Sequence, residues 1–282
     1  MSKKRLVVSL VVFLTLMAVL IVGICLTGSD GSHGEINETM KDAVLHEYDK
    51  IDLGFALVNP AVVSALVVTA VVFVFALVVR LFVIPRFKEV PGKFQLLLES
   101  WVGFFDDLAV SNSPHKNKFL GAYIFGAGSY IFIGTIFELF GIQAVTVEGA
   151  SVALPAPLSD INGALAMGCL SYLVIMSGGV IHNGIKGFLL TLKDFSLPIS
   201  MSFRLFGALL SGLLVTELVY HYLALSFVLP VIVGVLFTCL HAIIQTYVLV
   251  MLTSLFYGEV SEKHPKKPKK SKKIVKLEEA QQ

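Results

Sequence analysis

Residues 60–84 read PAVVSALVVTAVVFVFALVVRLFVI. The stretch contains one charged residue, Arg80, and its only other polar side chains are the hydroxyls of Ser64 and Thr69. A bilayer core of about 30 Å is crossed by about 20 apolar residues in an α-helix, which pairs the polar groups of its own backbone. This stretch therefore predicts a transmembrane helix.

Five further stretches are also long enough and apolar enough to predict membrane spans. They span residues 6–27, 119–142, 161–182, 197–227 and 228–257. Of the 282 residues, 56% are hydrophobic and 15% are charged, whereas about a quarter of a soluble domain is charged. The composition excludes disorder, a fibrous repeat and an ordinary soluble enzyme. It predicts an all-α polytopic membrane protein with five to six membrane helices.

The amino-terminal stretch has two interpretations. Lys3, Lys4 and Arg5 precede an apolar run that ends near Gly28, as in a secretory signal peptide. The run is longer than the core of most signal peptides, and no clear A-x-A site follows it, so residues 1–28 are either a cleaved signal or an additional membrane anchor.

Lysine and arginine residues set the orientation, because they accumulate in cytoplasmic loops. Segment 29–58 has two lysines against seven acidic residues, which predicts an extracytoplasmic segment. Loop 80–118 has six cations, loop 143–160 has none, and loop 183–196 has Lys186 and Lys193. The lysine-rich tail, residues 259–282, is then cytoplasmic. The tail either binds anionic lipid headgroups or only enforces this orientation.

An amphipathic segment follows Pro91 and Gly92 inside loop 80–118. Its apolar side chains recur with helical spacing, and its polar side chains lie on the other face: Phe94, Leu97, Leu98, Trp101, Phe105 and Leu108 against Gln95, Glu99, Asp106 and Asp107. The pattern predicts one interfacial helix. A short helix that caps the bundle is compatible with the same pattern.

Ionisable residues inside membrane spans are few, and each is expensive to bury in lipid. They are Glu138, Arg204, Glu217, His221 and His241, accompanied by the polar residues Thr238 and Gln245. Helical offsets put Gly207, Ala208 and Ser211 beside Arg204, so the cation lies on a shallow face that another molecule can approach closely. The alternative is an arginine that reaches the interface above a small-residue packing seam.

Two polar stripes are predicted on the last two spans. Glu217 and His221 share one helical face, and Thr238, His241 and Gln245 share another. Carboxylate and imidazole groups can relay protons, although the same stripes could be interhelical hydrogen bonds. Glu138 could be a hydrated carboxylate at the outer end of its span. The three cysteines, Cys25, Cys169 and Cys239, all lie in apolar segments and predict buried thiols rather than disulfides or metal ligands.

Five motifs resemble subunit a of the F-type ATP synthase. The segment PISMSFRLFG, residues 198–207, is close to P-[IVL]-S-[LM]-x-[LF]-R-L-F-G-N, and QTYVLVMLTSLFY, residues 245–257, is similar to the final helix of that family. Shorter matches are Asn59-Pro60, the segment 90–95 (VPGKFQ) and the segment 159–162 (SDIN). The motifs occur in order over residues 59–258, which the resemblance identifies as a subunit-a-like membrane domain.

The resemblance implies a stator subunit of a bacterial plasma membrane that conducts H⁺ or Na⁺ and is not catalytic alone. It implies a long, tilted carboxy-terminal helical hairpin, a c-ring of proteolipid subunits and b-type peripheral-stalk subunits as partners beside membrane lipid, and neither nucleic acid, cofactor nor metal. Arg204, with Gly207, Ala208 and Ser211, would face the ring. Ion translocation would involve Arg204 with the following residues: Glu138, Asp160, Asn162, Glu217, His221, Thr238, His241 and Gln245.

Three positions depart from the family pattern. Ala208 stands where an asparagine is usual, and Leu213 and Thr238 stand where the family commonly has glutamate or histidine. Glu217 lies four residues beyond Leu213, and His241 lies three beyond Thr238. We therefore expect the ionisable groups of the ion path to be shifted by one helical turn.

Two other function classes are compatible with intramembrane ionisable residues. A secondary transporter could use Glu217, His221 and His241 as a proton relay, but the paired broken helices of such folds are not evident. A membrane-embedded metalloenzyme is disfavoured because the histidines lie singly on separate helices without an H-E-x-x-H pattern.

Overall fold

The computed structural model describes residues 50–52, 57–114, 118–147, 149, 151–221 and 229–262, together with Thr15, Ala18 and Val22. Most of the predicted amino-terminal span and of the acidic segment 29–58, and the tail beyond residue 262, lie outside the described residues. The elements are, in order, β1 (Ile51–Asp52), β2 (Leu57–Val58), α3 (Pro60–Val78), η1 (Val79–Val83), η2 (Ile84–Arg86), α4 (Lys93–Asn112), α5 (Lys118–Phe137), η3 (Glu138–Phe140), β3 (Gln143–Val145), β4 (Ser151–Ala153), α6 (Ile161–Lys193), α7 (Ser196–His221) and α8 (Leu229–Ser261).

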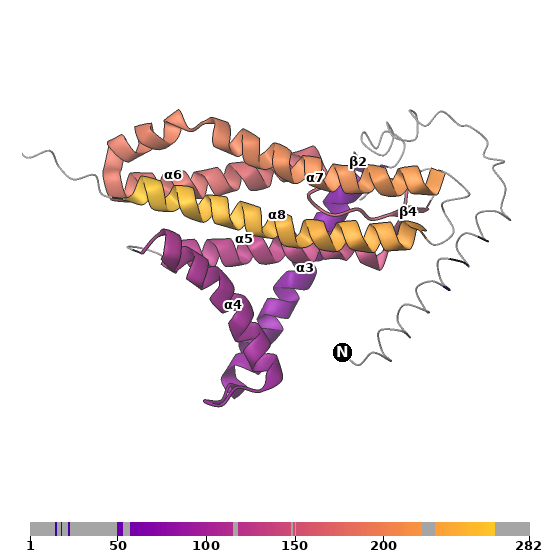
Figure 1. Ribbon diagram of the computed structural model, residues 1–282, viewed down its shortest axis with the longest axis horizontal. Helices are drawn as coiled ribbons and strands as arrows, with labels where there is room; N and C mark the ends of the chain where they lie inside the picture. Colours follow the sequence, from indigo (N-terminus) through magenta and orange to yellow (C-terminus); the bar gives the residue numbers. More distant parts are fainter. Residues whose placement is uncertain are drawn as a thin grey trace, which may run out of the picture.

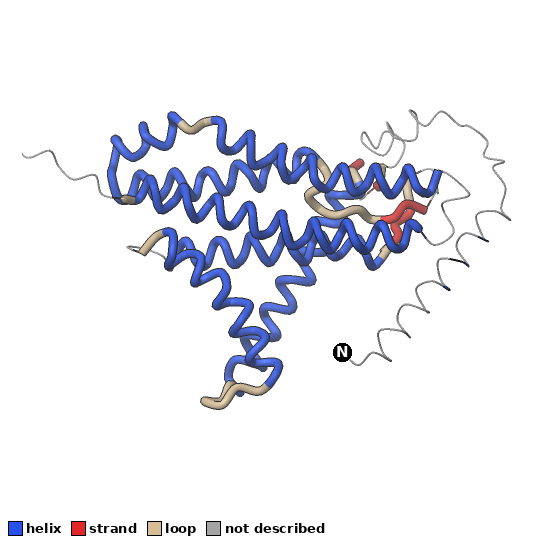
Figure 2. Tube along the Cα trace, in the orientation of Figure 1, coloured by secondary structure: helices blue, strands red, loops and turns tan. Residues whose placement is uncertain are grey.

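Four long helices form a bundle, and two others diverge from it. Helices α5, α6, α7 and α8 lie alongside one another, and α8 contacts α4, α5, α6 and α7. Helices α3 and α4 slant away from the bundle and meet at the turn between residues 84 and 93 (Figure 1). The two short antiparallel strand pairs, β1–β2 and β3–β4, lie near the end of the bundle where α6 begins (Figure 2).

Within the described residues, four helical segments are long and apolar enough to cross a membrane. They are Pro60–Arg86, Lys118–Phe140, Ile161–Lys193 and Val231–Ser261. The sequence-based expectation of an all-α polytopic membrane protein is confirmed, with two minimal strand pairs added. Helix α7 corresponds to the predicted stretch 197–227 but is not among the four segments.

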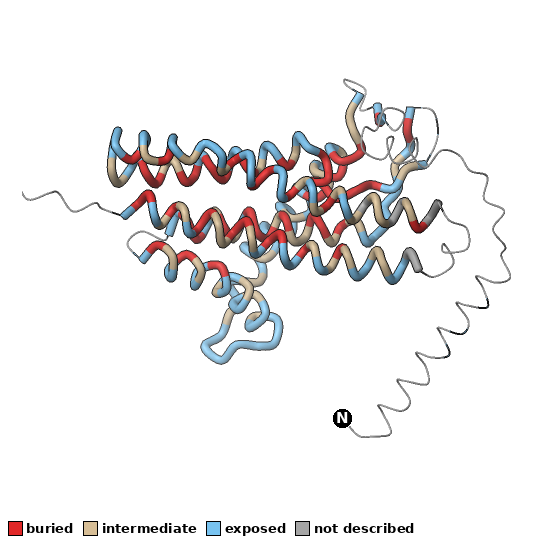
Figure 3. Tube along the Cα trace, turned by 45° about the horizontal axis from the view of Figure 1, so that its top comes forward, coloured by how far each residue is buried: buried red, intermediate tan, exposed pale blue. Residues whose placement is uncertain are grey.

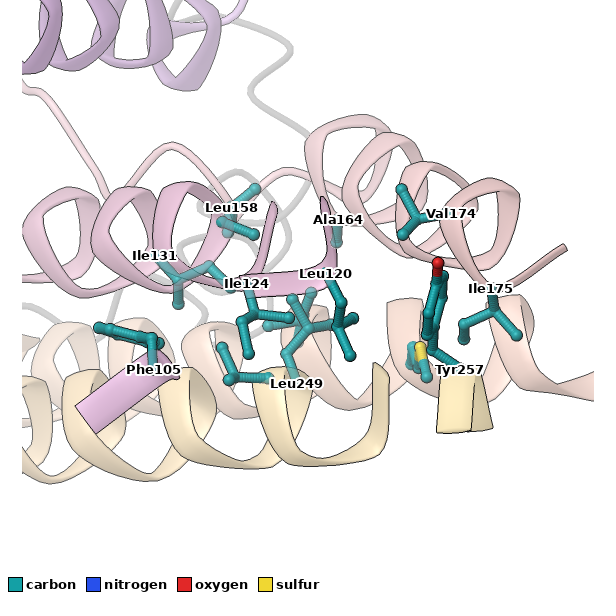
Figure 4. Close-up of a cluster of buried hydrophobic side chains, with 14 of the residues drawn as sticks. Phe105, Leu120, Ile124, Ile131, Leu158, Ala164, Val174, Ile175, Leu249 and Tyr257 are labelled. Carbon is teal, nitrogen blue, oxygen red and sulfur yellow. The ribbon is translucent and has the colours of Figure 1, made fainter. Parts of the chain in front are cut away.

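The core lies where α4, α5, α6, α7 and α8 meet. Five of its side chains are fully buried: Phe105, Leu120, Ile124, Ile131 and Ile175. Figure 4 shows most of this cluster between α5 and α8. A side chain at Gly128 would overlap the ring of Phe105, so the glycine admits the aromatic ring. Lipid tails are as apolar as these side chains, so close packing rather than the hydrophobic effect holds such helices together.

Helix α6 contains a sharp bend at Gly184, where φ is 58° and ψ is −140°. This left-handed conformation favours glycine, which has no Cβ. After the bend the chain is helical again and packs back on itself, because Cβ atoms at Gly179 and Gly187 would overlap the opposite backbone or side chains. The Tyr172 hydroxyl donates to the carbonyl oxygen of Thr191 at 3.0 Å. The segment expected to be loop 183–196 is therefore largely a second helical arm.

Helix α4, the predicted amphipathic segment, packs on the bundle through one of its halves. Its first half is exposed, as at Phe94 and Leu97, and its second half packs on the bundle through Phe105 and Ala109, both 0% exposed. Ser254 of α8 donates a hydrogen bond to the carbonyl oxygen of Leu108 at 3.0 Å. One half of the helix therefore caps the bundle and the other half is exposed (Figure 3). An interfacial position for the exposed half stays a prediction.

Candidate functional site

Arg204 lies on the outer face of α7. Met201, Leu205 and Leu209, which point into the bundle, are between 1% and 4% exposed. Arg204, Gly207 and Ser211 are exposed and Ala208 is half-buried. The arginine therefore lies on a face of small side chains, as the helical offsets predict, and no ion pair to it occurs among the described residues.

Glycines bring α7 close to its two neighbours. A Cβ at Gly168 of α6 would overlap the Ser202 hydroxyl of α7, so the two backbones approach closely there. A Cβ at Gly212 of α7 would lie 3.2 Å from Nδ1 of His241 of α8. The glycine thus provides the space that the imidazole occupies at the α7–α8 contact.

The polar stripe predicted on α8 faces the interior. Thr238 is 7% exposed and Gln245 is 6% exposed, and His241 is half-buried between them. The His241 ring also makes an edge contact with Phe237, with ring centroids 5.8 Å apart. Because three polar side chains recur on one inward face, this half of α8 offers hydrogen-bonding groups inside the membrane region.

Glu138 lies at the level of this stripe. It begins η3, which continues α5 and contacts α8. Helices α5 and α8 run in opposite directions, and a Cβ at Gly128 would lie 3.0 Å from the Val250 side chain. Glu138 lies ten residues after Gly128, and Leu240 lies ten residues before Val250. Because the two helices are antiparallel, Glu138 is level with Leu240, next to His241. The half-buried carboxylate and the imidazole therefore share one height in the bundle.

Arg204 and His241 lie at different heights. Gly212, which packs against His241, is eight residues beyond Arg204 on α7. At about 1.5 Å per helical residue the separation along the axis is about 12 Å. The cation and the imidazole are therefore offset along the hairpin rather than paired.

Glu217 and His221 occupy the last turns of α7, beyond Gly212. Their backbones thus continue toward the end of the bundle where Glu138 lies. Their side chains lie outside the described part of the chain, so the stripe expected from their spacing stays a prediction.

Asp160 and Asn162 are joined to each other at the start of α6. Asp160 is 8% exposed and its Oδ1 accepts a hydrogen bond from the backbone N–H of Asn162 at 2.6 Å. Its Oδ2 accepts from the side-chain amide of Asn59 at 2.7 Å. The geometry gives Asp160 a helix-capping position, away from Arg204 in sequence and on another helix.

Two polar contacts near the end of α8 were not anticipated from the sequence. Asn183, next to the bend of α6, donates to the carbonyl oxygens of Val260 at 2.8 Å and Glu262 at 3.0 Å. These are carbonyl groups that a helix leaves unpaired at its carboxyl end. The sequence feature that could have indicated these contacts is Gly184, because a glycine allows the chain to turn directly after Asn183.

The described residues contain no group of three or more histidine, cysteine, aspartate or glutamate side chains that could hold a metal ion.

Comparison with known proteins identifies a family that the chain matches and curated proteins to which it is similar. The sequence profile described as "ATP synthase A chain" matches residues 62–258. The chain is 26% identical over 261 residues to "ATP synthase subunit a 2" of Vibrio campbellii (strain ATCC BAA-1116), and the alignment covers 80% of this chain and 100% of that protein. The matched region begins in α3, ends in α8 and includes Arg204 and the polar stripe of α8.

Proposed function

Because the chain belongs to the ATP synthase A chain family, we propose that it provides two ion half-channels and an arginine that faces a rotating c-ring. The family is that of the membrane stator subunit, which takes part in ion translocation as one component of the ATP synthase complex. Catalysis of ATP synthesis is then a property of the complex. A multi-pass protein of a bacterial inner membrane agrees with both the relative and the apolar helices.

The position of Arg204 supports the proposal most directly. Its guanidinium is exposed on α7 beside Gly207 and Ser211, while the opposite face of the helix is buried. A ring helix can approach such a shallow face closely. A guanidinium keeps its charge at physiological pH, so it attracts an ionised ring carboxylate and repels cations that would pass directly between the half-channels.

The outer half-channel is assigned to the polar groups at the level of His241. Glu138, Thr238 and His241 lie at one height, and the α7 backbone at Glu217 continues toward the same end. An ion that enters there would reach the ring about 12 Å along α7 from Arg204. The offset allows the ring to rotate between entry and exit. Each charge that crosses makes about 2.3 kcal/mol available per 100 mV.

Purification in a mild detergent with a tag on this chain tests the assembly. We expect a ring of small proteolipid subunits and b-type stalk subunits to co-purify. A chain that is monodisperse and transports ions alone in liposomes would instead indicate a secondary transporter.

Arg204→Ala tests the role of the arginine in the assembled complex. We expect loss of coupled ATP synthesis, with the complex still assembled, because the Arg204 side chain is exposed on the outer face of α7. Phe203→Ala, one residue away and 57% exposed, is the matched control. Coupled synthesis that survives Arg204→Ala would contradict the proposed role.

A further inference from the structure

A cavity of about 650 Å³ lies between α3, α4 and α5. Its walls are apolar: Val72, Phe75 and Val79 line it from one side, and Trp101, Phe125 and Ile133 line it from the other. Figure 1 shows the two diverging helices, α3 and α4, that enclose this space. Three walls from three helices distinguish it from the flat apolar surface that any membrane helix presents to lipid.

The polar groups inside the cavity are already paired. The Trp101 indole N–H donates to the Ser129 hydroxyl at 3.0 Å. Glu99 accepts a hydrogen bond from the Gln95 amide at 2.8 Å. The interior therefore offers a ligand apolar contact rather than hydrogen bonds.

Four cations surround the turn that closes the cavity at the α3–α4 end. Arg80, Arg86, Lys88 and Lys93 are all exposed, against two acidic residues, Glu89 and Glu99. The turn is held to α4, because Gln95 accepts from the backbone N–H of Lys88 at 3.1 Å and donates to its carbonyl oxygen at 2.9 Å. Figure 3 shows most of this turn as exposed. An ordered, net positive rim thus borders an apolar cavity.

We propose that this cavity binds one anionic phospholipid, with an acyl chain between α3, α4 and α5 and the phosphate at the basic turn. Apolar walls match a hydrocarbon chain, and basic residues beside a membrane attract anionic headgroups. The site lies on the side that the positive-inside rule assigns to the cytoplasm. Its lining residues lie in α3, η1, η2, α4, α5 and the turn after η2, whereas Arg204 lies on α7.

The volume favours a lipid chain over a protein helix. Ten residues of α-helix, about 15 Å long and about 10 Å wide, fill about 1,200 Å³. The cavity, at about 650 Å³, is about half that size. It lies inside the range of about 300–1,000 Å³ that pockets for small ligands occupy.

Trp101 provides a direct readout, because it is the single tryptophan of the chain and lines the cavity. The full-length chain is reconstituted in phosphatidylcholine vesicles that contain a small, fixed fraction of lipid brominated on its acyl chains. Bromine quenches indole fluorescence on contact. We expect brominated phosphatidylglycerol to quench Trp101 more strongly than brominated phosphatidylcholine, with a preference of about fivefold for each basic residue that contacts the headgroup.

Two pairs of variants separate the headgroup from the chain. Arg86→Gln combined with Lys88→Gln should abolish the preference for phosphatidylglycerol, whereas Lys118→Gln combined with Lys193→Gln, which are exposed cations elsewhere, should retain it. Gly126→Leu should fill the cavity and reduce the preferential quenching, because a Cβ at Gly126 meets nothing within 4 Å and the residue lines the cavity. Gly103→Leu on α4, equally open but outside the lining, is its control.

Three results would overturn the proposal. Equal quenching by the two brominated lipids would mean that ordinary boundary lipid fills the space. Weak quenching by both would mean that no lipid acyl chain enters the cavity. A preference that survives Gly126→Leu would place the anionic lipid elsewhere.

Discussion

The side-chain amide of Asn59 donates a hydrogen bond of 2.7 Å to Oδ2 of Asp160, across 101 positions of sequence. Asn59 directly precedes α3 and Asp160 directly precedes α6. The other carboxylate oxygen, Oδ1, accepts from the backbone N–H of Asn162 at 2.6 Å. One buried carboxylate therefore caps α6 and fixes the start of α3 to the bundle.

Asp160→Asn should destabilise the protein by about 1–3 kcal/mol. The new side chain keeps an oxygen for the cap but presents an NH₂ group to the NH₂ group of Asn59, so a buried hydrogen bond is lost. Asp160→Ala also removes the helix cap, so it should lower the free energy of unfolding by a further ~1 kcal/mol. Denaturation of the chain in mixed micelles, followed by circular dichroism, measures both changes.

The exchanged pair Asn59→Asp with Asp160→Asn is the control, because it restores one donor and one acceptor at this contact. We expect it to recover most of the lost stability and to retain ion translocation in the assembled complex. A double variant that is stable but does not translocate ions would show instead that Asp160 takes part in the ion path, as the family resemblance implies.

Gly258→Ala should weaken the contact between α8 and the end of α4. A Cβ there would overlap the carbonyl oxygen of Asn112, and overpacking of this kind costs about 1–3 kcal/mol. Gly234→Ala, the same change on the same helix, meets nothing within 4 Å of the described atoms and should be neutral or stabilising, since alanine favours helix. Equal denaturation midpoints for the two variants would contradict the close α4–α8 approach.

The apolar runs predicted the spans well because a helix in lipid needs a minimum length of apolar sequence and little else. The four spanning segments among the described residues agree with the predicted stretches to within a few residues, apart from the extension to Lys193. The face of α7 that exposes Arg204 followed from helical periodicity alone. Both features depend only on residues near one another in sequence.

The rest depends on contacts between distant residues, which periodicity does not specify. The second arm of α6 was expected to be a loop because Lys186 and Lys193 lower its hydropathy, whereas the bend itself depends on one glycine in a left-handed conformation. Asp160 was predicted to take part in ion translocation because of its motif, residues 159–162. Neither this motif nor Asn59-Pro60 indicates the hydrogen bond between Asp160 and Asn59. The common height of Glu138 and His241 likewise requires the register of α5 against α8.

Glu217→Leu should lower proton-driven ATP synthesis by about tenfold or more if the ion path has shifted by one helical turn, a change of about 1.4 kcal/mol or more in the barrier. Adding Leu213→Glu returns a carboxyl group to the position that the family commonly uses, and should restore part of the activity. Synthesis rates in inverted vesicles, normalised to the amount of complex, test both variants. Unchanged synthesis in Glu217→Leu would refute the shifted path.

Gly212→Ala should impair ion flow through its effect on His241. The new Cβ would lie 3.2 Å from Nδ1 and 3.3 Å from Cε1 of the imidazole, so the ring must move by a few tenths of an ångström. If the imidazole relays protons, both Gly212→Ala and His241→Ala slow coupled synthesis, and the double variant is no slower than His241→Ala, because the two changes act on one group. Gly234→Ala on α8, where no such contact exists among the described atoms, should leave the rate unchanged. Additive effects of Gly212→Ala and His241→Ala would show that the glycine acts on another contact, and the outer half-channel would then have to be assigned without this imidazole.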